Sequence, residues 1–153
     1  MFNKIYELID WSIRSNLASI LTDCPHREKL GWLEVAHLMQ HAMQYRYQLD
    51  GLYSKVMGDI KDSQTQEGIV PSIAPEYVRF ADGFENSPEW GSAFIIIPWY
   101  VYRWYGDKSL LSAYYPYMKR YLNICRLVRI IILLLMAWGI GLIWDLSIRG
   151  IRS

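Results

Sequence analysis

A stretch of more than twenty residues in the middle of the chain is rich in residues that interrupt helices. The segment 67–90, EGIVPSIAPEYVRFADGFENSPEW, contains two glycines and three prolines. A proline inside a helix removes a backbone hydrogen bond and clashes with the preceding turn, so this segment cannot form a long helix. Loops of this length in compact domains are usually functional or disordered. The Ile, Val, Tyr, Phe and Trp content of this loop predicts that it is packed.

Apolar residues recur at helical spacing on both sides of this loop. Before the loop they predict three helices, over residues 3–20, 33–48 and 52–64. After it they predict a helix over 90–104, which Pro98 kinks or begins, and a further helix beyond the turn at Gly106 and Asp107. No segment has a strand pattern of comparable strength. The sequence therefore predicts an all-α fold of helical hairpins, with functional loops at one end.

The overall composition excludes few classes of protein. A chain of 153 residues predicts one domain. Sixteen basic and fifteen acidic residues leave a net charge of +1, which gives no electrostatic argument for nucleic acid as a partner. Two cysteines are too few for a disulfide framework. Acidic residues within the first helix exclude a signal peptide at the beginning of this chain, so the compartment stays open.

A second polar loop, TDCPHREKLGW at residues 22–32, admits three interpretations. The first is a metal site, because one thiol and three imidazoles follow one another at short spacing: Cys24, His26, His37 and His41. The two basic residues Arg27 and Lys29 would repel a cation there, so we predict no metal. The second interpretation is structural: Thr22 or Asp23 caps a turn, and Arg27 pairs with an acidic neighbour.

The third interpretation is a general acid for glycoside cleavage. Such an acid works near neutral pH when apolar walls or a second carboxylate surround it. The apolar residues Leu30 and Trp32 closely follow Glu28, and Asp23 and Glu34 are near it in sequence. Glycoside hydrolysis uses an acid of this kind together with a second carboxylate. The abundant aromatic residues suit either sugar stacking or a helical core.

The stretch NLASILTDCPHREKLGWLEVAHL resembles the signature of bacterial α-L-rhamnosidases of the six-hairpin glycosidase type. Three later segments resemble the parts that follow in the same family: DSQTQEGIVPSIAPEY, SPEWGSAFIIIPWYVYRWYGDKSLL and YYPYMKRYL. The resemblance covers residues 10–124. It implies a partial (α/α)6 barrel, a carbohydrate partner and inverting hydrolysis of a terminal α-L-rhamnoside, with no cofactor required.

The resemblance also implies roles for single residues. Glu28 matches the family's general acid, while Asp23 and Arg27 match positions that bind the rhamnose ring. Trp32 matches an aromatic wall of the pocket. Many members follow this tryptophan with Thr-Gly-Asp, whereas the nearest acid here is Glu34. We expect four of these residues to converge on one concave surface at the ends of the helices: Asp23, Arg27, Glu28 and Trp32. Glu89 or Trp90 of the later loop is expected to lie on its rim.

The chain changes character after residue 124, so we divide it into a barrel part, 1–124, and an atypical tail, 125–153. The fifteen residues from Ile130 to Trp144 carry no charge, which is fewer than the roughly 20 that span a bilayer. Three origins remain open: a frameshift, a membrane anchor over 127–146, or an ordinary buried helix. In each case we expect residues 127–144 to be helical.

The frameshift is the favoured origin because of the stretch MAWGI at residues 136–140. Its codons, read two bases later, permit Gly-Leu-Gly-Asp-Trp, which the family carries at this distance after its Tyr-rich helix. The family's catalytic base is a glutamate far downstream of the region that resembles this chain. We therefore expect a hydrolase fragment that is inactive alone. The alternative is a non-enzymatic helical protein held at a membrane by its tail.

Overall fold

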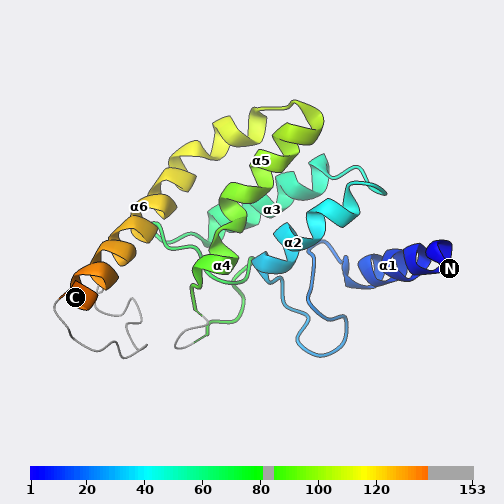
Figure 1. The fold of residues 1–153 in the computed structure, drawn as a ribbon, viewed down its shortest axis with the longest axis horizontal. Helices are drawn as coiled ribbons and strands as arrows, with labels where there is room; N and C mark the ends of the chain where they lie inside the picture. The colour runs from blue at the N-terminus through cyan, green and yellow to red at the C-terminus, as the bar shows by residue number, and fades with distance from the viewer. Residues whose placement is uncertain (81–84, 138–153) are drawn as a thin grey trace.

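The computed structural model describes residues 1–80 and 85–137, with side chains described as far as residue 128. The all-α prediction is confirmed. The described ranges contain no strand, and their extended residues form only two isolated bridges, Leu17 with Leu21 and Trp32 with Ile73. The helices, shown in Figure 1, are α1 (Phe2–Asn16), α2 (Leu33–Met43), α3 (Asp50–Ser63), α4 (Pro88–Gly91), α5 (Ala93–Tyr105) and α6 (Ser109–Ala137).

Two predicted helices end earlier than their apolar pattern suggested. The helix predicted over 3–20 ends at Asn16, because Leu17 turns to an extended conformation. The backbone N–H of Thr22 then donates to the carbonyl of Asn16 at 2.9 Å, and the Thr22 hydroxyl lies 3.2 Å from the same oxygen. The helix predicted over 33–48 ends at Met43, whose carbonyl accepts the N–H of Tyr47 in a turn.

The other differences lie in the second half of the chain. The single helix predicted over 90–104 is divided at Ser92 into α4 and α5. Pro98 is buried inside α5 rather than at its start. Gly106 ends α5 with a φ of 71°, a left-handed conformation that glycine adopts without steric penalty. The predicted tail helix is described as far as Ala137, and residues 138–144 lie outside the described ranges.

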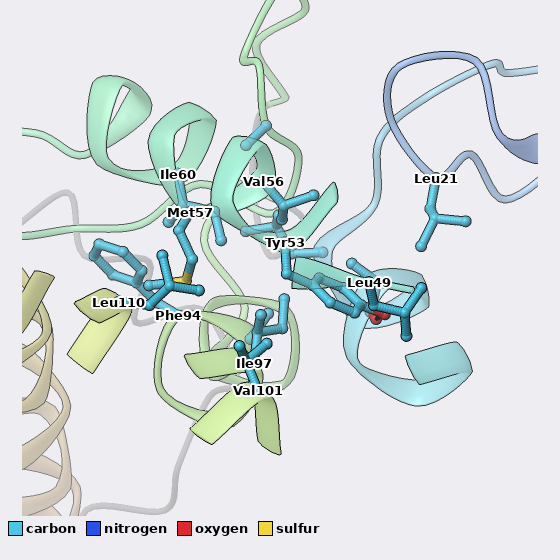
Figure 2. Packing of buried hydrophobic residues seen from close by; sticks show 14 of the residues in the cluster. Leu21, Leu49, Tyr53, Val56, Met57, Ile60, Phe94, Ile97, Val101 and Leu110 are labelled. Atoms are coloured by element: carbon cyan, nitrogen blue, oxygen red, sulfur yellow. Dashed lines mark hydrogen bonds between the residues drawn. The ribbon is translucent and has the colours of Figure 1, made fainter. Parts of the chain in front are cut away.

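Helix α5 lies at the centre of the packed body and contacts α2, α3 and α6. Figure 2 shows the side chains of α3 and α5 meeting in the core. Tyr53, Met57 and Ile60 from α3 and Phe94 and Ile97 from α5 are each 0% exposed. Removing these apolar groups from water supplies the main driving force for folding. Aromatic residues contribute to this core: Tyr53, Phe94 and Tyr121 are buried in it.

Helix α1 projects away from this body, as Figure 1 shows. A buried carboxylate anchors it: Asp10 accepts hydrogen bonds from the Arg46 guanidinium, 2.9 Å from Nε, and from the Tyr47 hydroxyl. The hydrogen bond from Tyr47 lowers the pKa of Asp10 from its ordinary value of 3.8. Partial burial opposes that effect, and the charge of Arg46 adds to it. Several apolar side chains of α1 stay exposed: Phe2, Ile5, Leu8 and Trp11.

None of the helices within the described ranges combines the length and the apolar character needed to cross a bilayer. Part of the segment 127–146, on which the membrane alternative depends, lies outside the described ranges. Helix α6 runs without a break through the predicted boundary at residue 124.

Candidate functional site

The two polar loops meet along a short antiparallel pairing. The N–H of Ala74 donates to the carbonyl of Gly31 at 3.1 Å, and the N–H of Leu33 donates to the carbonyl of Ser72 at 3.0 Å. Trp32 and Ile73 form the bridge between these bonds. Figure 1 shows both loops at the same end of the helices. This pairing therefore sets the position of the side chains at the start of α2.

The loop 67–90 packs against the rest of the chain over residues 68–74, which are buried. The Tyr77 hydroxyl donates to the carbonyl of Lys29 at 3.0 Å. The N–H of Ser72 donates to the carbonyl of Glu85 at 3.1 Å, which closes the loop on itself. Ile73 is 1% exposed. The prediction of a packed loop is confirmed for these residues.

Glu28 is joined to Trp32 by a direct hydrogen bond. The indole Nε1–H of Trp32 donates to Oε2 of Glu28 at 3.0 Å. Two features of the loop turn the chain so that these residues meet. The N–H of Glu28 donates to Sγ of Cys24 at 3.2 Å, and Lys29 adopts a left-handed φ of 58°. The Glu28 carboxyl is exposed, with the Trp32 indole beside it.

Trp32 also stands at the centre of an aromatic cluster. Its ring stacks on Phe80, with centroids 5.1 Å apart and an interplanar angle of 19°. Its centroid lies 5.9 Å from that of Trp90, at 53°. Trp32 therefore contacts an acidic residue of the first loop and an aromatic residue at the end of the second. Glu28, Trp32 and Trp90 come together in space, although 62 positions separate the first from the last.

Within the described ranges, no side-chain hydrogen bond or ion pair joins Glu28 to Asp23, Arg27 or Glu34. Asp23 and Arg27 are exposed, and neither has an ion-pair partner among the residues that the structure describes. The expected pairing of Arg27 with an acidic neighbour is therefore absent from those residues. Glu34 is half-buried in the first turn of α2.

Glu89 turns toward its own loop. Its carboxylate accepts a hydrogen bond from the Ser87 hydroxyl, which lowers the pKa of Glu89 below its ordinary value. The Glu89 carbonyl lies 3.2 Å from Nε2 of His37, the ring nitrogen that can donate to it. This contact holds α4 against α2, which keeps Trp90 close to Trp32.

The residues considered for a metal do not gather at one point. Cys24 accepts the N–H of Glu28, and His37 contacts the Glu89 backbone. The ring of His41 lies edge-on to Tyr100, with centroids 4.3 Å apart. Within the described ranges, no group of three or more His, Cys, Asp or Glu residues is placed to hold a metal ion.

Sequence reasoning missed Phe80 and Tyr77, which complete the site from the second loop. Both lie in the stretch EYVRF, where two aromatic residues stand three positions apart inside a loop. That clustering was a usable signal. The spacing alone did not reveal which residue of the first loop each aromatic side chain contacts.

Two shallow hollows lie away from these residues. One, of about 360 Å³, lies near the start of α6 and is lined by Tyr102, Lys108, Leu111, Ser112 and Tyr115. The other, of about 320 Å³, lies between α1 and α2 and is lined by Tyr6, Ile9, Asp10, Ile13, Ala42, Tyr45 and Arg46. Neither includes the Glu28, Trp32 and Trp90 cluster.

Residues 1–128 match the family model of the bacterial alpha-L-rhamnosidase 6 hairpin glycosidase domain. Proteins named alpha-L-rhamnosidase from Formosa agariphila and Alteromonas sp. are 36% and 34% identical to this chain over 130 and 122 residues. These matches cover 80% and 79% of this chain. They cover only 14% and 13% of the two relatives.

The fold is similar to solved structures of the same kind. The α-L-rhamnosidase from Dictyoglumus thermophilum superposes with a TM-score of 0.76 at 36% identity, over 82% of this chain and 14% of that one. The Streptomyces avermitilis α-L-rhamnosidase, solved in complex with L-rhamnose, gives a TM-score of 0.72 at 30% identity, over 80% and 12%. The described helices therefore correspond to part of an (α/α)6 barrel, as predicted.

Proposed function

This chain belongs to the bacterial α-L-rhamnosidase six-hairpin glycosidase family, and we propose that it is the part of a glycoside hydrolase that supplies the general acid for cleaving terminal α-L-rhamnosides. One observation supports this most directly. Trp32 contacts both Glu28 and Trp90, so an exposed carboxyl group lies beside an aromatic wall at the loop end of the helices. A sugar recognised there would meet both a proton donor and apolar ring faces.

Glu28 protonates the oxygen of the glycosidic bond as that bond breaks. A general acid must reach within hydrogen-bond distance of the atom it protonates. The exposure of Glu28 allows such an approach, and the Trp32 indole beside it supplies an apolar side. Two neighbours of Glu28 bind the sugar. The acidic Asp23 accepts hydrogen bonds from ring hydroxyls, and the basic Arg27 donates to the hydroxyl oxygens.

The substrate is a carbohydrate that ends in α-L-rhamnose. One relative of known structure was solved with L-rhamnose bound, and its fold matches 80% of this chain. Trp90 and Phe80 form the apolar rim of the site, and Trp32 lies between them and Glu28. Glu34 and Glu89 complete the polar rim on α2 and α4.

The reaction proceeds with inversion, which requires a second carboxylate. In inverting enzymes the two carboxyl groups lie about 6.5–9.5 Å apart, leaving room for the attacking water. We place this base in a part of the barrel beyond the segment covered by this chain, which spans 14% or less of its relatives. The loss of general-base assistance alone lowers rates by about 10²–10⁴-fold. The isolated chain therefore shows no measurable turnover.

We also propose that residues 1–124 form the barrel part and that 125–153 are a separate tail. The family match, which ends at residue 128, supports a boundary near this point. The barrel part is therefore the portion to transfer in an activity test.

The test compares the 153-residue chain with a completed barrel. In the completed barrel, residues 1–124 replace the matching segment of the 36% identical relative. Both proteins are incubated with a chromogenic α-L-rhamnoside. We expect turnover by the completed barrel only, loss of turnover on Glu28→Gln, and no change on Glu7→Gln, an exposed glutamate of α1.

Two results would contradict the proposal. Turnover that persists after Glu28→Gln would remove Glu28 from the acid role. NMR of the first-formed sugar tests the stereochemistry: inversion releases the β anomer, and an initial α anomer would show retention.

A further inference from the structure

We propose that Trp32 is a positioning residue that holds Glu28 for proton donation, an inference that rests on the proposed function of Glu28. The role predicted from the sequence was a wall that stacks on the sugar. The structure points to another, because the indole N–H is bonded to the carboxyl group itself. Trp32 would then act on the reaction through Glu28.

The hydrogen bond distinguishes the two oxygens of the carboxyl group. An indole N–H can only donate, so the oxygen that it contacts must accept. The distance of 3.0 Å lies within the normal range for N–H···O hydrogen bonds. The carbonyl oxygen of a neutral acid accepts better than its hydroxyl oxygen, so this bond favours the transferable proton on the other oxygen.

Trp32 is well suited to hold a mobile side chain in place. A long, exposed glutamate samples several rotamers unless a partner restrains it. Trp32 is itself restrained twice. Its backbone lies in the bridge with Ile73, and its ring is stacked on Phe80 and contacts Trp90. The contact of Glu28 N–H with Cys24 fixes the backbone on the other side.

The proton transfer balances when the attacking water and the base of the completed barrel are included. The O–H bond of the neutral acid breaks, its electron pair stays on the carboxylate, and the proton bonds to the glycosidic oxygen. The bond from that oxygen to the sugar carbon breaks, and its electron pair leaves with the protonated leaving group. The water oxygen bonds to the sugar carbon from the opposite side and gives its proton to the base. The new carboxylate keeps the Trp32 hydrogen bond, which is stronger to a charged acceptor than to a neutral one.

The stacking on Phe80 argues against a sugar platform at Trp32. With the rings 5.1 Å apart and nearly parallel, one face of the indole is already covered. The two roles predict different effects of Trp32→Phe. Phenylalanine keeps an aromatic face for a sugar but lacks the N–H donor.

The first test is an NMR measurement on the 153-residue chain labelled at its seven tryptophans. The Trp32 Nε1–H signal is assigned as the one that Trp32→Phe deletes. We expect Glu28→Ala to shift this signal and to speed its exchange with water. The matched control, Glu89→Ala, alters a carboxylate of the same loop end that Trp32 does not contact and should leave the signal in place. An unchanged signal in Glu28→Ala would overturn the proposal.

The second test separates kcat from KM in the completed barrel. We expect Trp32→Phe to lower kcat about tenfold or more, since a hydrogen bond to a charged group is lost, while KM changes little. Trp99→Phe, at an exposed tryptophan of α5 outside the Glu28, Trp32 and Trp90 cluster, should keep kcat within about twofold, a change that corresponds to only a small difference in barrier.

The outcomes distinguish this inference from the proposed function. An active completed barrel whose kcat is unaffected by Trp32→Phe would overturn the positioning role only. A rise in KM with kcat unchanged would show a sugar platform and would overturn it too. A completed barrel with no activity of its own would overturn the acid role of Glu28, and the positioning role with it.

Discussion

The carbonyl oxygen of Ala74 lies 2.8 Å from the position that a Cβ atom on Gly31 would occupy. Cδ1 of Ile20 lies 2.9 Å from the same position. The two loops of the site can approach this closely only because residue 31 has no side chain. A glycine in the motif of the first loop thus sets the distance to the second.

Gly31→Ala should destabilise the chain by about 1–3 kcal/mol, because a backbone oxygen cannot move aside easily and overpacking strains the site. Urea unfolding measures the effect. Gly51→Ala is the matched control, since no atom lies within 4 Å of a Cβ on Gly51 in α3. The control should be neutral or stabilising by up to about 1 kcal/mol. Equal effects of the two variants would contradict the close approach of the loops.

Phe80→Leu should loosen the second loop from Trp32. An aromatic pair contributes about 0.5–1.5 kcal/mol beyond the area it buries, and leucine keeps most of the apolar volume. We expect faster protease cleavage within residues 75–80, mapped by mass spectrometry. Tyr102→Leu is the control, because it removes a comparable ring contact with Trp99, 5.8 Å away on α5. Unchanged cleavage in Phe80→Leu would mean that the stack does not hold the loop.

The anchoring of α1 should depend on pH through Asp10. The pKa of Asp10 is lowered in the folded chain. The charged form of Asp10 therefore stabilises the fold at pH values above 3.8, the ordinary pKa of an aspartate. This contribution is lost as the pH falls below 3.8 and through the folded pKa. Backbone chemical shifts of α1, recorded from pH 6 to pH 2.5, should report its release from Arg46 and Tyr47.

Asp10→Asn provides the control for that titration. In this variant the part of the α1 shift change that comes from Asp10 should be lost over the same pH range. Asp107 and Glu89 also have lowered pKa values, mainly through hydrogen bonds from Ser109 and Ser87. Total stability therefore reflects several carboxyl groups, whereas the difference between the α1 signals of the two proteins isolates Asp10, because Glu7 of α1 is present in both. An identical α1 titration in Asp10→Asn would exclude Asp10 as its cause.

Met57→Ala should cost about 2–5 kcal/mol of unfolding free energy, the usual range for a large residue truncated in a core. Met57 is 0% exposed on α3, between the helices that form the centre of the body. Leu38→Ala on α2 is the comparison, because Leu38 is 61% exposed. Its effect should remain within about 0.5 kcal/mol. Thermal unfolding followed by circular dichroism compares the two.

Much of the secondary structure could be predicted from the sequence, because helices depend on local patterns. The apolar periodicity of residues 33–48 and 52–64 identified α2 and α3, and Gly106 marked the end of α5. The ends of helices were less predictable. Asn16 ends α1 because Thr22 returns to cap it, although apolar spacing continues as far as Ile20.

The motif TDCPHREKLGW by itself determined the family and the residues to consider, since a family signature is a property of the order of residues. Only the tertiary structure decided which of them meet. It joined Trp32 to Glu28, stacked Phe80 on Trp32 and directed Glu89 toward Ser87. Trp32 and Phe80 are 48 positions apart in the chain. Contacts at such separations depend on how the core packs and how the loops pair, and no local spacing encodes that.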